Sequence, residues 1–312
     1  MTLSRARMLG LLGAAVAAAP ARVIAQSGPV IRVGVEDAET YGEPLYGIDA
    51  GIFARAGLNV EATILPAAGT IAAALAGGAL DVGLTDAIVL ANAVNRGVPI
   101  VAIAASGLFR TTDPTSGLCV PKNSALRTAK SFEGGSIAVG TLVSLTSVSL
   151  KMWLARNGAN PAGVRFVEMP FNDMPAALAR GTVSGAYVTE PLLTRNAADL
   201  QLIATPYGAI AESFPISLIA AGRAWLAQNP EPARRFVAAL YETARWANAN
   251  REVTAPMLAR HSKIELEVIR RMRRTLFATS LDAGMVQPVL DAAFANKLID
   301  RQTNAADLIA RV

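Results

Sequence analysis

The chain of 312 residues has very few of the side chains that most enzymes use for catalysis. Cys119 is its only cysteine and His261 its only histidine. A disulfide within the chain is therefore impossible, and so is a metal site built from several Cys and His side chains. A Ser-His-Asp triad could form only if His261 took part in it. We expect no catalytic residue, no metal and no cofactor, so carboxylates and hydroxyls remain as the candidate functional groups.

Charged residues are also scarce, at 17% of the chain. The densest basic cluster lies within residues 270–274, just after Glu265 and Glu267 in a segment with helical spacing. Mixed charges along one helix are typical of a solvent-exposed face. Because a nucleic-acid-binding protein carries a concentrated basic patch, no nucleic-acid partner is expected.

Long apolar runs are few, and the one at the N-terminus is short. Arg5 and Arg7 precede an apolar run of 12 residues, Met8 to Ala19, and a small-residue site follows that ends at Ala25. This order is typical of a secretory signal peptide, whereas a membrane anchor needs about 18 apolar residues. We therefore predict export and cleavage near Ala25, with residues 1–25 as the signal peptide. Its removal takes away three arginines and no acid, which lowers the net charge from +5 to +2.

Strand-like and helix-like patterns alternate from residue 30 to about residue 205. A first unit of five elements is expected at residues 30–35, 44–55, 60–65, 70–76 and 82–85. The same strand and helix order is expected again at residues 136–139, 146–156, 164–168, 174–179 and 185–189. The ends of the two units are similar in sequence, ALAGGALDVGLTDA from Ala74 and ALARGTVSGAYVTEP from Ala177, and each closing strand ends at Thr followed by an acid. The chain therefore contains two similar α/β lobes.

Alternating strands and helices with short connections predict mostly parallel, doubly wound sheets. The segments Ser106–Ser116 and Tyr207–Pro215 are rich in Gly, Ser, Thr and Pro, and we interpret them as the two crossings of a hinge. Lobe I would then comprise residues 26–110 and 216–312, and lobe II residues 111–215. Further helical segments are expected near the C-terminus, at residues 223–227, 231–250, 252–261, 265–277, 282–296 and 304–311.

The chain resembles the substrate-binding proteins of ABC importers of the nitrate/sulfonate/taurine and thiamine-precursor type. The matching stretches, which extend over nearly the whole chain after residue 25, are IRVGV, YGIDAGIFARAGLNV, ALAGGALDVG, VPIVAIA and ALARGTVSGAYVTEP. This resemblance implies a bilobal fold like that of type II periplasmic binding proteins, with extra C-terminal helices. It also implies a periplasmic location, hinge closure around a small-molecule solute, and delivery to a membrane permease with its ATPase. Such a protein would be a monomer that meets the membrane only by peripheral docking.

Ligands of doubly wound sheets bind at the carboxyl ends of the strands, so the loops after the strands supply the candidate contacts. In lobe I these are Asp37, Thr40, Tyr41, Gly69, Thr70, Thr85 and Asp86. In lobe II they are Thr141, Ser144, Thr146, Phe171, Asn172, Thr189 and Glu190. The aromatic side chains among them could line the site or belong to the core.

Helix starts near Thr70 and Ser144 offer free N–H groups to an anion, although Ser and Thr are also common helix caps. Asp86 and Glu190 argue against the smallest oxyanions, because an unpaired carboxylate beside an anion is costly to bury. Either they meet an amine or a ring N–H of the ligand, or they cap backbone and do not touch it. The alternative function is an enzyme on the same fold, a lyase or a relative of thiamine-pyrimidine synthase. That synthase branch depends on a His and a Cys-rich motif, and this chain has one Cys in all.

Overall fold

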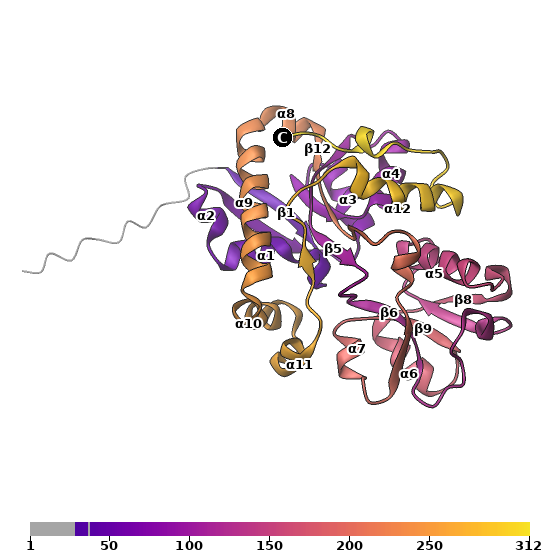
Figure 1. The fold of residues 1–312 in the computed structure, drawn as a ribbon. Helices are drawn as coiled ribbons and strands as arrows, with labels where there is room; N and C mark the ends of the chain where they lie inside the picture. Colours follow the sequence, from indigo (N-terminus) through magenta and orange to yellow (C-terminus); the bar gives the residue numbers. More distant parts are fainter. Residues whose placement is uncertain (1–28, 37) are drawn as a thin grey trace, which may run out of the picture.

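The structure is a computed structural model that describes residues 29–36 and 38–312. The expected signal peptide and the candidate contact Asp37 lie outside the described residues. The described chain forms two five-stranded sheets wrapped by helices, and a three-stranded sheet joins them (Figure 1). The predicted α/β class, with two wound sheets and extra C-terminal helices, is confirmed. No helix in residues 29–36 or 38–312 is both long and apolar enough to cross a membrane.

The first sheet has the strand order β2-β1-β3-β12-β4. Its strands are β1 (Val30–Val35), β2 (Asn59–Ile64), β3 (Val82–Thr85), β4 (Ile100–Ala105) and β12 (Leu218–Gly222). β1 is parallel to both β2 and β3, whereas β12 runs antiparallel to β3 and β4. The sheet is therefore mixed, because β12 enters it on the way back from the second sheet.

The second sheet repeats this arrangement with the order β10-β6-β9-β7-β8. Its strands are β6 (Ser116–Pro121), β7 (Ser136–Val139), β8 (Arg165–Glu168), β9 (Gly185–Thr189) and β10 (Leu200–Ala204). β7 is parallel to β8 and β9, and β6 runs antiparallel to β9. β9 thus occupies the place that β3 has in the first sheet, as the repeated sequence predicts.

Helices cover both faces of each sheet. Buried side chains of α1 (Glu43–Asp49), α2 (Ile52–Arg55) and α9 (Pro230–Ala249) lie on one face of the first sheet, and those of α3 (Ala68–Ala76), α4 (Ala87–Asn95) and α12 (Ala283–Ala295) on the other. On the second sheet, α5 (Leu145–Arg156) covers one face, and α6 (Met174–Ala179) and α7 (Leu192–Arg195) cover the other. The cluster under α3, α4 and α12 continues into the one under α5.

The three-stranded sheet joins segments that are far apart in the sequence. β5 (Gly107–Arg110) and β11 (Ser213–Pro215) come from the two predicted hinge crossings and pair antiparallel to each other. β13 (Leu276–Phe277) pairs with the other edge of β5. The C-terminal part of the chain is thereby attached to the connection between the two large sheets.

The C-terminal helices differ from expectation in two segments. α8 (Arg223–Gln228) and α10 (Arg251–Ser262) lie close to their expected bounds, whereas the helix predicted over residues 304–311 was too long, because only the one-turn 3-10 helix η6 (Ala305–Leu308) forms there. The helix predicted over residues 265–277 was too long, because α11 ends at Arg271 (Leu266–Arg271). Beyond it the backbone leaves the helix to pair elsewhere: Thr275 N–H donates to Glu39 and Phe277 N–H to Asn248. The helix expected over residues 44–55 is likewise divided, at Gly51, whose φ of 67° is left-handed.

Candidate functional site

The first strand edge brings together two polar residues from neighbouring strands. β1 and β3 are parallel, with Val33 beside Val82 and Gly34 beside Gly83. The same register, continued by two residues, places Glu36 beside Thr85 on the sheet face that α3 and α4 cover. Thr85 is fully buried, and its hydroxyl has no hydrogen-bond partner among the described residues. A buried hydroxyl without a partner is costly, so Thr85 is a candidate ligand contact.

Asp86 follows Thr85 and caps the next helix. Its Oδ1 accepts hydrogen bonds from the backbone N–H of Ile88 at 2.8 Å and of Val89 at 2.9 Å. Burial raises the pKa of Asp86, and these two hydrogen bonds oppose that shift. Oδ2 accepts no hydrogen bond from the described residues, so the carboxylate keeps acceptor capacity toward the sheet edge.

Glu36 is a member of this edge that sequence reasoning missed in favour of Asp37. Burial, followed by the charge of Asp86, raises the pKa of Glu36 to about 7, and a hydrogen bond from Ala68 N–H lowers it. A signal was available: alternation along β1 turns Ile31, Val33 and Val35 to the opposite face, so Glu36 shares its face with Gly34. The N–H of Ala68 belongs to the start of α3, so Glu36 lies where a ligand anion was expected.

Thr40 and Tyr41 lie in the one-turn helix η1 (Glu39–Tyr41). The carbonyl of Thr40 accepts a hydrogen bond from Ser217 Oγ, so its backbone is packed against the connection to the second lobe. Tyr41 is half-buried, and burial together with the nearby charges of Asp86 and Glu36 raises its pKa. Tyr41 therefore joins Glu36 and Asp86 in one cluster.

A buried ion pair holds η1 in place. Arg274 Nε lies 2.6 Å from Glu39 Oε1, and both side chains are less than a tenth exposed. Arg274 also donates to Tyr46 Oη at 2.9 Å and to Thr254 Oγ1 at 3.1 Å. The interpretation of residues 270–274 as a solvated basic face was therefore wrong for Arg274, which supports the loop that carries Tyr41.

The start of α3 is open. Gly69 and Thr70 are exposed, and no side chain caps the helix. A Cβ atom added at Gly69 would meet nothing within 4 Å. Both residues are thus accessible beside Glu36, and the Thr70 hydroxyl has no hydrogen-bond partner among the described residues.

In the second lobe, most of the predicted hydroxyls are used by the protein itself. Ser144 caps α5 by accepting from Ser147 N–H at 3.2 Å, and its hydroxyl donates to the carbonyl of Thr141 at 2.9 Å. Thr146 is buried, with its hydroxyl 3.3 Å from Tyr207 Oη. Thr141 itself is exposed, while the next backbone N–H, that of Leu142, donates to Glu168 Oε2 at 2.9 Å.

Apolar side chains are exposed around the same edge. Leu142, Val143 and Phe171 are 46%, 66% and 40% exposed, and they follow β7 and β8. The ring of Phe171 lies against Gly140, where an added Cβ would be 2.6 Å from Cζ. Asn172 is exposed and lines a separate groove between α6 and α7.

Glu190, at the end of β9, is hydrogen-bonded on both oxygens. It accepts from Thr194 N–H at 3.0 Å, from Thr194 Oγ1 at 3.1 Å and from the backbone N–H of Arg273 at 3.3 Å. Burial raises the pKa of Glu190, and these hydrogen bonds oppose the shift. Thr189 is half-buried and pairs with Ser116 across the strands. Glu190 therefore joins α7 to the C-terminal segment rather than pointing a free carboxylate at the edge.

Tyr207 connects the two edges, although no sequence pattern selected it for the site. It lies in η5 (Pro206–Ala209), next to α5, with its ring centroid 5.3 Å from that of Tyr187 and 5.4 Å from that of Phe109. Burial raises the pKa of Tyr207, and the charge of Asp86 acts in the same direction. Asp86 of the first sheet and Thr146 of the second lobe thus both lie near one phenol.

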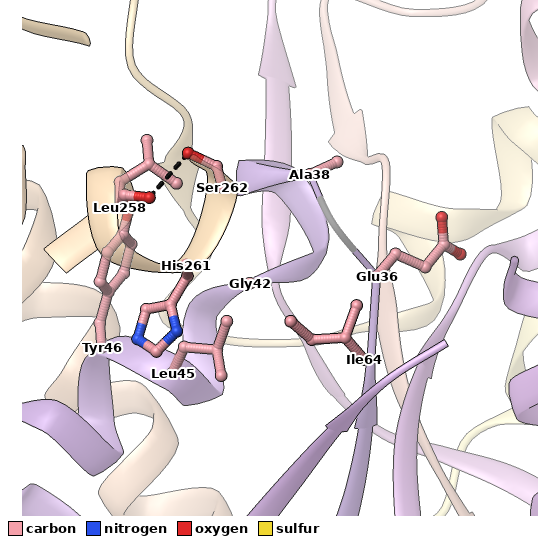
Figure 2. Close-up of a pocket in the computed structure, with 9 residues that line it drawn as sticks. All are labelled: Glu36, Ala38, Gly42, Leu45, Tyr46, Ile64, Leu258, His261 and Ser262. Carbon is pink, nitrogen blue, oxygen red and sulfur yellow. Dashed lines mark hydrogen bonds between the residues drawn. The ribbon is translucent and has the colours of Figure 1, made fainter. Parts of the chain in front are cut away.

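A small cavity of about 20 Å³ lies beside this cluster, between α1 and α10 (Figure 2). His261, Leu258 and Ser262 line it from α10, and Tyr46 and Leu45 from α1. Figure 2 shows the Glu36 carboxyl turned away from these residues. Glu36, which follows β1, and Ile64, at the end of β2, line its other side, so the cavity reaches the strand edge, but it is large enough for one water molecule only. The described residues contain no group of three or more His, Cys, Asp or Glu placed to hold a metal ion.

Comparisons with known proteins agree on the fold. Residues 28–260 match the model of the NMT1-like family. The aliphatic sulphonate-binding protein SsuA of Escherichia coli has a TM-score of 0.77 at 17% identity, covering 91% of this chain and 93% of that one. The nitrate-binding protein NrtA of Synechocystis PCC 6803 has a TM-score of 0.70 at 16% identity, covering 89% and 84%. The desulfurization enzyme DSZB has a TM-score of 0.69 at 12% identity, covering 91% and 97%. No curated protein matches the sequence.

Proposed function

Since this chain belongs to the NMT1-like family, we propose that it is the solute-binding component of an ABC importer. The observation that carries the proposal is the polar cluster at the carboxyl edge of the first sheet. Thr85 has a buried hydroxyl without a described partner, and Glu36 and Asp86 lie next to it. Unsatisfied buried groups at such an edge are typical of a ligand site.

Capture of the solute would occur by closure of the two lobes. The antiparallel pair β5 and β11 is a narrow connection between the two large sheets. Rotation about such a connection is a common mode of closure around a ligand. We assign residues 26–110 and 216–312 to lobe I and residues 111–215 to lobe II, with Tyr207 at their meeting point.

The remaining features follow from the transport role. Residues 1–25 direct export to the periplasm and are cleaved near Ala25. The mature protein acts as a monomer that carries a small organic anion or heterocycle to a membrane permease with its ATPase. Because binding proteins and an enzyme share this fold, fold alone does not exclude catalysis. No observation at the two edges favours a catalytic role.

Thermal-shift screening of the mature chain tests the proposal. The panel contains sulfonates, nitrate, aromatic acids, amines and pyrimidines. A solute at 100 times its dissociation constant should raise the free energy of unfolding by about 2.7 kcal/mol. The same solute should protect the segments Ser106–Ser116 and Tyr207–Pro215 from limited proteolysis. Turnover of a panel member, without stabilisation by any of them, would identify an enzyme instead.

A further inference from the structure

Of the two helix starts predicted to attract an anion, the one near Thr70 already faces a carboxylate of the protein. The Glu36 carboxylate lies close to the backbone N–H of Ala68 at the start of α3, and Asp86 caps α4, while in the second lobe Glu168 accepts from Leu142 N–H, three residues before α5. No Lys or Arg side chain forms an ion pair or hydrogen bond with Glu36 or Asp86 within the described part of the chain. Negative charge of the protein thus already stands at the positive ends of α3 and α4. A simple oxyanion placed here would meet negative charge.

We propose that the solute presents a protonated amine or an N–H donor to Glu36, Thr85 and Asp86, and an apolar body to the opposite lobe. This inference rests on the proposed function, because it concerns the ligand of the same site, and it narrows the solute to one with an amine or N–H donor, such as a heterocycle, and away from a simple organic anion. Glu36 and Asp86 supply acceptor oxygens, and a cationic donor would compensate their charge. Hydrogen bonds between charged groups are stronger than those between neutral ones, so such a head group gains most at this edge.

Thr85 is independent support for a ligand at this edge. It is fully buried and without a described hydrogen-bond partner, and the register of β1 and β3 places it beside Glu36. Its oxygen can accept a hydrogen bond from an N–H group without a change of charge. A donor that reaches both Glu36 and Thr85 would satisfy this hydroxyl.

The second lobe determines the rest of the solute. Leu142, Val143 and Phe171 expose apolar surface on the loops after β7 and β8. Adjacent exposed apolar side chains on a soluble domain commonly mark a binding surface. An aromatic or aliphatic body would cover them on closure, and methylammonium would leave them uncovered.

Four probes test the proposal on the mature wild-type protein by calorimetry. Benzylammonium, benzyl alcohol and phenylmethanesulfonate share one body and differ in the head group, while methylammonium keeps only the head. We expect benzylammonium to bind at least about tenfold more tightly than each of the others. Phenylmethanesulfonate binding as tightly as benzylammonium would overturn the inference and leave the proposed function standing. So would panel hits that all lack an amine or N–H donor. Stabilisation by no solute at all would overturn both.

Substitution and pH locate the head group. Glu36→Gln should weaken benzylammonium binding about tenfold and change benzyl alcohol binding less than about twofold. Glu61→Gln is the matched control, because Glu61 is exposed on β2 of the same sheet. Since the pKa of Glu36 is raised to about 7, beside Asp86, Tyr41 and the Ala68 N–H, wild-type affinity for benzylammonium should rise between pH 6 and pH 8. Equal losses in both variants, or affinity that falls over this pH range, would contradict the assignment.

Discussion

Thr85-Asp86 and Thr189-Glu190 occupy equivalent positions in the two large sheets. Each pair stands at the carboxyl end of a strand that lies between a parallel and an antiparallel neighbour. In each pair the acid accepts a backbone N–H from the helix that follows. Up to this point the repeated sequence has a repeated structural role, the capping of a helix at the strand edge.

The two pairs differ in which side-chain oxygen atoms remain without a hydrogen bond once the helix is capped. Asp86 uses one oxygen, and the buried hydroxyl of Thr85 has no described partner. Glu190 uses both oxygens and also accepts from Arg273, which belongs to the C-terminal segment. Arg195 of α7 adds an ion pair of 2.7 Å to Glu265, next to α11, and these two helices are in contact (Figure 1). The first pair keeps capacity for a ligand, whereas the second joins parts of the protein.

The largest effect of substitution at the two strand ends is expected for Glu190, on the free energy of unfolding. Glu190→Ala removes the acceptor of three hydrogen bonds and should lower the free energy of unfolding by about 2–3 kcal/mol, measured by urea denaturation. Glu133→Ala is a suitable control, because Glu133 is exposed in the same lobe and accepts one hydrogen bond, from Asn160 N–H. We expect a loss of less than about 1 kcal/mol there. Similar losses in the two variants would show that Glu190 is not a special connection.

A smaller effect, of a different kind, is expected at Asp86. Asn and Asp are equally good helix caps, so Asp86→Asn should change the free energy of unfolding by less than about 0.5 kcal/mol. The loss of charge should weaken benzylammonium binding by about 1 kcal/mol and strengthen binding of phenylmethanesulfonate. Calorimetry with the two probes measures both effects. Glu190→Gln is the control and should leave both affinities unchanged, so parallel changes in the two variants would remove the distinction between the strand ends.

The sequence predicted most of the fold because its signals are local. Apolar runs, Gly after helices and the duplicated ALA-Gly stretches placed the strands of both units within about two residues. The helix over residues 265–277 was overextended because its end depends on Glu39 and Asn248, which are distant in sequence. No pattern within a segment reports such contacts.

The site was less predictable for the same reason. The strand ends could be predicted from the sequence. The two possible roles of Asp86, as a helix cap or as a ligand contact, could also be predicted. Glu36 required the register of β1 against β3, and Tyr207 required the packing of η5 on α5. Glu190 could be read as a cap, but its bond to Arg273 joins residues 83 positions apart. Long-range pairing therefore decides which of the predicted polar residues remain available for a solute.

The smallest effect concerns the two threonines. Thr85→Val keeps the shape of the side chain and removes a buried hydroxyl that has no described partner. The free energy of unfolding of the ligand-free protein should therefore rise by about 0.5–1 kcal/mol. Thr189→Val changes a half-buried residue and should alter stability by less than about 0.5 kcal/mol.

Ligand binding should distinguish the same two variants as well, but here Thr85→Val is expected to be the unfavourable substitution. Thr85→Val removes an acceptor at the proposed head-group position, so it should weaken benzylammonium binding by about 0.5–1.5 kcal/mol, while Thr189→Val should leave it unchanged. Urea denaturation without solute, followed by calorimetry with benzylammonium, gives both quantities for each variant. A Thr85→Val protein that is more stable and binds less tightly would mark an unsatisfied group kept for a ligand. Lower stability in Thr85→Val, with unchanged affinity, would instead mean that the hydroxyl supports the fold and that both strand ends are structural.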